Sequence, residues 1–172
     1  ADAVRAYIQL GLGYVRQGNT QQAKIPLKQA LEIDSSSAEA YAALGLVFQL
    51  EKEPQSADEN YRKALSISKD PRILNNYGSF LYDAGRYGEA YQRFQEAAAD
   101  PLYPERARIF ENLGLTALKQ GRKSEAREHF DKSLALDRRE PRVLLELALL
   151  THDAHDYVES RNYFTRMLRL QP

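Results

Sequence analysis

The sequence predicts an all-α solenoid of about five helical hairpins. Three observations support this prediction: a period near 34 residues, small residues at two fixed places in each period, and apolar residues spaced for one helical face. Residues 74–97 show the pattern most clearly. Tyr77 and Leu81 share a face of the first helix, and Phe94 lies on the second helix after a turn at Gly85.

Small residues mark the places where the two helices of each hairpin should cross. A residue with little or no side chain lets two helix backbones approach, so that larger neighbours interlock around it. Elsewhere in a helix, glycine would cost about 1 kcal/mol relative to alanine. The predicted crossing residues are Gly11, Gly45, Gly78 and Gly114 on the first helices and Ala23, Ala57, Ala90 and Ala126 on the second, with Ala148 and Ser160 in the last hairpin.

A large residue also recurs four positions after each second small residue, as Leu27, Tyr61, Phe94, Phe130 and Phe164. This period with these residue types resembles the tetratricopeptide repeat (TPR). The resemblance implies a right-handed superhelix, with repeats at residues 4–37, 38–70, 71–106, 107–140 and 141–172. The last repeat is degenerate. We expect a truncation before a sixth repeat, or a partner at this end, because Leu168 and Leu170 would otherwise lie uncovered.

Capping residues mark several helix starts. Asn19 suits an N-cap position with Gln22 as its capping-box partner, and Ser36 with Glu39 forms the same pattern before the second repeat. Pro54 suits the first position of a helix, where its missing N–H is not needed.

The connection between the third and fourth repeats is longer than the others and contains Pro101 and Pro104. Two prolines stiffen such a connection. Either it is a tolerated insertion, or Leu102 and Tyr103 form an exposed contact feature, since connecting segments often carry function.

Composition excludes several classes of function. The 172 residues include 24 basic and 24 acidic side chains, so the chain lacks the basic surface that nucleic acid requires. No apolar run approaches the roughly 18 residues of a membrane span, and we expect a soluble chain. Cysteine is absent, which excludes disulfides and thiolate chemistry within this sequence.

Neither catalysis nor a cofactor is expected. Gly11–Gly13 lacks the third glycine and the preceding strand of a nucleotide-binding loop. His152 and His155 could bind a metal ion, and a metalloenzyme is the third function class that we consider, but the predicted helix ends near His155. His129 is interpreted as a surface histidine.

Three stretches resemble a narrower family: YIQLGLGYVRQGNTQQAKIPLKQALEID (7–34), LNNYGSFLYDAGRYGEAYQRF (74–94) and PLYPERARIFENLGL (101–115). They are similar to the type IV pilus biogenesis and stability TPR lipoproteins (PilF/PilW), also called pilotins. The resemblance implies a lipid-anchored protein on the periplasmic face of the outer membrane that assists the secretin subunit in reaching that membrane and forming its pore. The anchor would depend on residues upstream of Ala1.

The resemblance also indicates where a partner would bind. First helices of such repeats line a concave groove, and most of the matching positions here are apolar, which suits an amphipathic helix or an extended apolar segment. Leucine follows most crossing residues, which disfavours the carboxylate clamp of co-chaperone TPR modules. The candidate groove comprises Ile8, Leu12, Val15, Leu46, Gln49, Asn75, Ser79, Tyr82, Leu115 and Leu118, with Ala42, Glu111, Leu145, Leu149 and His152 at equivalent positions.

The leading hypothesis is therefore a non-catalytic scaffold that binds the secretin subunit through the apolar surface of the early repeats. The alternative is a generic TPR adaptor or co-chaperone that binds another helical or extended peptide.

Overall fold

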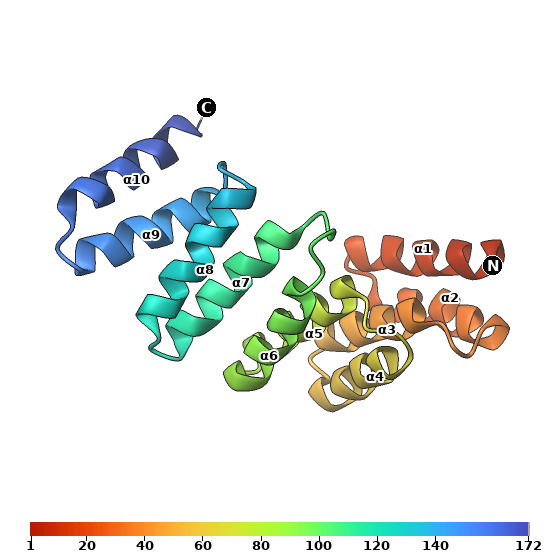
Figure 1. The fold of residues 1–172 in the computed structure, drawn as a ribbon. Coiled ribbons are helices and arrows are strands. Elements are labelled where there is room, and N and C mark those ends of the chain that lie inside the picture. Colours follow the sequence, from red (N-terminus) through yellow and green to blue (C-terminus); the bar gives the residue numbers. More distant parts are fainter. Residues whose placement is uncertain (172) are drawn as a thin grey trace. The chain divides into compact units, whose positions relative to one another are not determined.

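The computed structural model describes residues 1–171, which form ten α-helices and no strand. This confirms the all-helical prediction and its TPR-type succession of hairpins. The helices are α1 (Asp2–Arg16), α2 (Thr20–Ile33), α3 (Ala38–Leu50), α4 (Pro54–Ile67), α5 (Pro71–Asp83), α6 (Tyr87–Ala98), α7 (Arg106–Lys119), α8 (Lys123–Leu136), α9 (Pro141–Asp153) and α10 (Tyr157–Arg169) (Figure 1).

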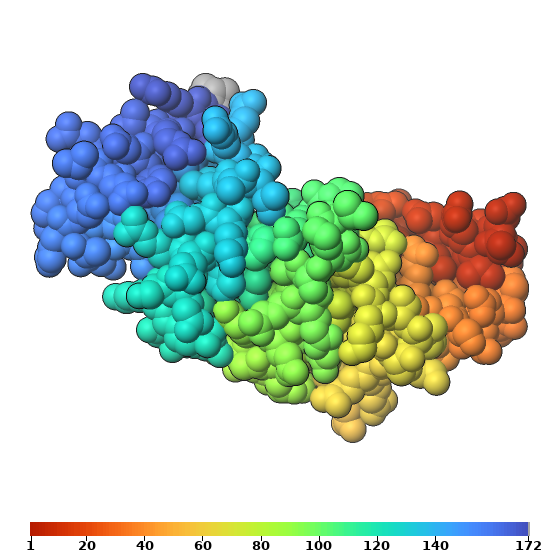
Figure 2. Space-filling model, in the orientation of Figure 1, coloured from red at the N-terminus to blue at the C-terminus, as the bar shows by residue number. Residues whose placement is uncertain are grey.

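The helices form two compact units, Ala1–Phe80 and Leu81–Pro172, which we call the first unit and the second unit. In the first unit α1 packs against α2 and α3 against α4, while α1 also contacts α3. In the second unit α7 pairs with α8 and α9 with α10, and α6 contacts α7. Side chains fill the spaces that the ribbons leave between paired helices (Figures 1 and 2). No helix within residues 1–171 is long and apolar enough to cross a bilayer.

Large side chains of the second helices lie directly against the glycines of the first helices. A Cβ atom added to the glycine would lie 2.7 Å from Leu27 at Gly11, 2.9 Å from the Tyr61 ring at Gly45 and 2.4 Å from the Phe130 ring at Gly114. Gly78 is buried as well, and Ala23, Ala57, Ala90 and Ala126 are fully buried on the second helices. Leu27, Tyr61 and Phe130 therefore have room in the core only because the residues opposite them are glycines, which have no side chain.

The helix starts differ from the capping predictions at two places. Ser37, not Ser36, is the N-cap of α3, and its Oγ accepts a hydrogen bond of 3.2 Å from the Ala40 N–H. The Ser36 N–H instead donates to Asp34 Oδ1 at 2.9 Å, which holds Ser36 in the preceding turn. Asn19 occupies the N-cap position of α2, but its side chain makes no capping bond.

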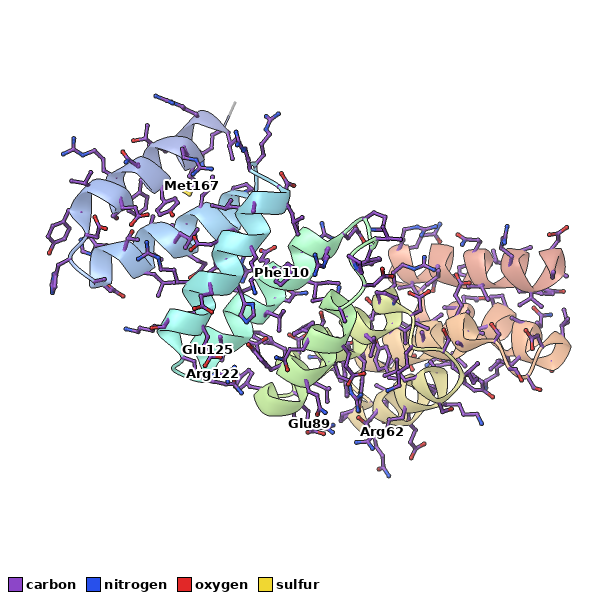
Figure 3. All side chains as sticks on the ribbon, viewed as in Figure 1. Arg62, Glu89, Phe110, Arg122, Glu125 and Met167 are labelled. Carbon is purple, nitrogen blue, oxygen red and sulfur yellow. The ribbon has the colours of Figure 1, made fainter. Side chains whose placement is uncertain are left out.

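An aromatic cluster closes the core of the first unit. The fully buried Tyr61 ring lies 5.6 Å from the rings of both Tyr77 and Phe80, measured between centroids. The Tyr77 hydroxyl donates to Asp58 Oδ1 at 2.6 Å, and Arg62 Nε pairs with Asp58 Oδ2 at 2.7 Å (Figure 3 labels Arg62). Burial, and then the Asp58 carboxylate, raise the pKa of Tyr77. The cluster thus joins α4 to α5 through both apolar and polar contacts.

Candidate partner-binding groove

The first unit carries an apolar hollow of about 120 Å³ over its first helices. Helix α1 supplies one lining residue, α3 four, and α5 with the residue before it the remaining four. The lining consists of Leu12, Glu39, Ala42, Ala43, Leu46, Asp70, Arg72, Ile73 and Asn76. Five of these nine side chains are apolar, so the hollow offers a surface that water solvates poorly.

The helical repeat explains the position of the two leucines. Leu12 and Leu46 follow Gly11 and Gly45, so each is rotated about 100° from the glycine that faces its own second helix. This rotation turns both leucines away from the hairpin interior and leaves them half-buried. Ala42 is one turn before Leu46 and too short to fill the space beside it.

Charged residues line one side of the hollow. The Arg72 N–H donates to Asp70 Oδ1 at 2.8 Å, and Arg72 Nε lies 3.8 Å from the same oxygen. Glu39, on the first turn of α3, is exposed and makes no ion pair among residues 1–171. With two carboxylates and one guanidinium, this rim carries a net negative charge.

Two of the predicted groove residues pack in the core, and a third makes a hydrogen bond within its own hairpin. Ile8 was predicted to line the groove, but it is only 2% exposed and belongs to the hydrophobic core of the first unit. Val15 is half-buried against the same core. Gln49 accepts a hydrogen bond of 2.8 Å from the Tyr61 hydroxyl, so it has a structural contact at the end of the α3–α4 hairpin.

On α5 the hollow lies one residue away from the predicted positions. Asn75 and Ser79 are half-buried but do not line it, whereas Ile73 and Asn76 do. The hollow lies between α3 and the side of α5 that is turned toward it. Asp70, Ile73 and Asn76 lie on this side because they are spaced three residues apart. That spacing is the sequence signal for these residues.

The equivalent positions of the second unit are also largely apolar, and Leu149 is 45% exposed. Leu115 and Leu118 pack in part against its core, and the Tyr82 ring packs edge-on against Tyr87 at 5.3 Å. Glu111 is half-buried, and burial raises the pKa of its carboxyl, while Arg142 opposes that effect. Apolar side chains therefore occupy groove positions in both units, and the hollow of about 120 Å³ lies in the first.

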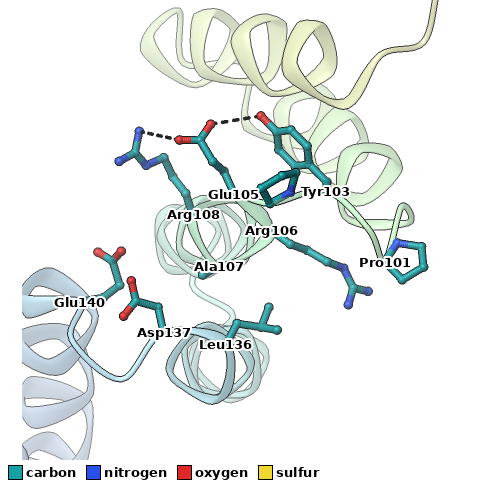
Figure 4. Close-up of a pocket in the computed structure, with 10 residues that line it drawn as sticks. Pro101, Tyr103, Glu105, Arg106, Ala107, Arg108, Leu136, Asp137 and Glu140 are labelled. Atoms are coloured by element: carbon teal, nitrogen blue, oxygen red, sulfur yellow. Dashed lines mark hydrogen bonds and ion pairs between the residues drawn. The ribbon is translucent and has the colours of Figure 1, made fainter.

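The long connection in the second unit borders a cavity of about 360 Å³ (Figure 4). Half of its lining is charged, with Glu105, Arg106, Arg108, Asp137 and Glu140 around it. Arg106 is held there by a hydrogen bond of 2.8 Å from its Nε to the Ala98 carbonyl. Leu102, at the tip of the connection, is 86% exposed. The charged lining makes this cavity a poorer site for an apolar segment than the hollow.

The two histidines near the end of α9 contact a tyrosine. His155 Nδ1 lies 2.9 Å from the Tyr157 hydroxyl, and both imidazole rings pack edge-on against the Tyr157 ring. Helix α9 ends at Asp153, so His155 lies in the turn, with φ at 63°. Within residues 1–171, no group of three or more His, Asp or Glu side chains is arranged to hold a metal ion.

His129 is not a surface histidine, contrary to the sequence-based interpretation. Its Nε2 lies 2.6 Å from the Tyr91 hydroxyl, and its ring stacks on Phe110 at 6.1 Å (Figure 3 labels Phe110). Its Nδ1 is buried without a hydrogen-bond partner in the described chain. This contact could not be predicted from local sequence patterns, because Tyr91 precedes His129 by 38 residues.

The second unit should therefore lose stability as the pH falls below about 6.5. Burial, and then the nearby Lys132, lower the pKa of His129 from its ordinary value of 6.5. The unfolded chain then binds more protons than the folded chain between the folded and the unfolded pKa, so the free energy of unfolding falls as the pH falls through this range. Urea unfolding of the wild type and His129→Gln between pH 7.5 and 5 checks this. The variant should show the smaller change, and equal changes would contradict the assignment.

Comparisons with known proteins agree with this architecture. Tetratricopeptide repeat family models match residues 4–37, 38–71, 71–139 and 111–172. The type IV pilus assembly protein PilF of Pseudomonas aeruginosa is 58% identical over 164 residues, which are 95% of this chain and 65% of that protein. The chain thus spans 65% of the length of this curated relative.

Two solved structures show the same relationship. A structure of P. aeruginosa PilF is 55% identical and superposes with a TM-score of 0.96 over 99% of this chain and 78% of that one. PilW, a widely conserved type IV pilus biogenesis factor, is 30% identical with a TM-score of 0.87 over the same shares of the two chains. Sequence, repeats and fold agree, and the chain belongs to the PilF/PilW family of TPR proteins of type IV pilus assembly.

Proposed function

We propose that this protein is a pilotin, a non-catalytic scaffold that binds the secretin subunit of the type IV pilus. Its role would be to assist the subunit in reaching the outer membrane and forming a multimeric pore. The protein would work on the periplasmic face of that membrane, held by a lipid at the N-terminus of its full-length form. Family membership supports the pilus system, and the apolar hollow of the first unit is the observation that supports binding of a client protein.

The hollow supplies the physical basis for this binding. Burying apolar surface favours binding by about 25 cal/mol per Å². An apolar segment of the secretin subunit would gain this free energy on entering the hollow. Leu12 and Leu46 are only half-buried, so a segment laid over α1 and α3 would cover what remains of both. Helix-in-groove recognition uses contacts of this kind.

Aspartate in the hollow should weaken binding of the secretin subunit at least tenfold. In Leu46→Asp or Leu12→Asp, a carboxylate would have to lose its water on binding without gaining a partner. Co-purification detects whether the secretin subunit is bound, and calorimetry with the two purified proteins measures its affinity. The matched control is Ile25→Asp, because Ile25 is 58% exposed on α2 and does not line the hollow.

Circular dichroism establishes that each variant remains helical. Wild-type affinity in both hollow variants, with helicity retained, would show that the secretin subunit binds elsewhere. Equal weakening by Ile25→Asp would contradict the choice of the hollow, since a general effect of surface charge would then explain all three results.

A further inference from the structure

We infer that the hollow of the first unit selects a partner segment with two features: one large aliphatic or aromatic side chain, and a lysine or arginine within one helical turn of it. This inference depends on the proposed function, because it specifies the chemistry of the segment that the same hollow binds. The apolar side chain would enter between Leu12 and Leu46, and the basic side chain would reach the rim at Glu39.

The volume of the hollow indicates a single anchoring side chain. Pockets for drug-sized ligands measure about 300 to 1,000 Å³. The hollow measures only about 120 Å³, close to an engineered cavity of about 150 Å³ that holds one benzene molecule. One leucine, isoleucine or phenylalanine side chain has the matching size, and protein interfaces commonly concentrate binding energy in such an anchor.

Two alanines keep the space open. Ala42 and Ala43 of α3 are 8% and 4% exposed, and both line the hollow. Any larger side chain at Ala42 would project into the space that the anchor needs. The size of the anchor that the hollow accepts therefore depends on the small side chain of Ala42.

The charge on the rim favours a basic neighbour. Arg72 is engaged with Asp70, whereas Glu39 has no basic partner among the ion pairs of residues 1–171. A lysine or arginine beside the anchor would neutralise this carboxylate, and an acidic residue there would be repelled. Complementarity of this kind contributes mainly to specificity and to the rate of association.

Filling the hollow tests the anchor. Overlapping synthetic peptides covering the secretin subunit are titrated against the protein, and the bound peptides should share the anchor and the basic residue. Ala42→Leu should lower their affinity at least tenfold while circular dichroism shows that the variant remains helical. Ala6→Leu is the matched control, because Ala6 is exposed on α1 and does not line the hollow.

Reversing the rim charge tests the basic neighbour. Glu39→Lys should lower the affinity about fivefold at low salt, with a smaller loss at high salt as the charges are screened. Replacing the peptide's basic residue with glutamate should restore binding to this variant. Glu59→Lys serves as control, since Glu59 is exposed on α4 and does not line the hollow.

Distinct outcomes separate the two proposals. Unchanged affinity in Ala42→Leu overturns the anchor, and unchanged affinity in Glu39→Lys at every salt concentration overturns the basic neighbour. If no peptide binds, yet Leu46→Asp still releases the intact secretin subunit, the inference fails and the proposed function stands. The inference is also overturned if sedimentation shows a dimer that Ala42→Leu dissociates, because a second copy of this chain would then occupy the hollow.

Discussion

Replacing Gly114 with valine should destabilise the second unit by about 3 kcal/mol, the upper part of the range for overpacked cores. The first added atom alone, Cβ, would lie 2.4 Å from Phe130 Cε1 and 2.6 Å from Cδ1. Phe130 is fully buried, so its ring cannot move aside without displacing other core residues. Urea unfolding followed by circular dichroism at 222 nm measures the loss.

Two further variants separate overpacking from helix propensity. Gly88, the second residue of α6, is exposed, and a Cβ there would meet nothing within 4 Å, so Gly88→Ala should not destabilise the protein. Phe130→Leu should relieve the clash, and its combination with Gly114→Val should cost less than the sum of the two single changes. Additive losses would mean that Gly114 and Phe130 do not compete for the same space.

The helices were predictable because their signals are local. Apolar spacing, glycine turns and Pro54 at the start of α4 each depend on residues within one or two helical turns. Choosing between Ser36 and Ser37 as the cap of α3 was harder, because neighbouring serines offer the same oxygen. The contact of Asp34 with the Ser36 N–H decides between them, and composition alone does not show it.

The hollow could be predicted only in part. Leu12 and Leu46 follow from the period, because their positions are fixed relative to the glycine of their own hairpin. Ile73 and Asn76 depend on how α5 is rotated against α3, and that angle follows from packing between hairpins rather than from any one repeat. Ile8 was misplaced because it is buried in a core cluster to which α1, α2 and α3 all contribute.

Ser160 shows that an irregular repeat can still pack well. It stands where the other hairpins have alanine, and the sequence alone makes the last repeat look degenerate. Ser160 is 3% exposed, and its Oγ donates a hydrogen bond of 2.8 Å to the Ala148 carbonyl of the paired helix. A hydroxyl that can bond to a nearby carbonyl fits almost the same space as a methyl group.

Replacing Tyr61 with alanine should destabilise the first unit by about 3–5 kcal/mol, the range for removing a large aromatic side chain from a core. Tyr61 is fully buried, and its ring lies 5.6 Å from both Tyr77 and Phe80. Tyr61→Phe keeps these ring contacts and loses the hydrogen bond from the hydroxyl to Gln49, so it should cost about 1 kcal/mol. Denaturant unfolding of both variants measures the contrast.

The same contact can be tested from its other side, at Gly45. A Cβ at Gly45 would lie 2.9 Å from the Tyr61 ring, so Gly45→Ala should destabilise the wild type by overpacking. In the Tyr61→Ala background the added methyl group enters the vacated space and gains the helix propensity of alanine, about 1 kcal/mol over glycine. The effect of Gly45→Ala should therefore change sign between the two backgrounds. A loss of stability in both would show that the backbone of α3, rather than the Tyr61 ring, requires glycine at this position.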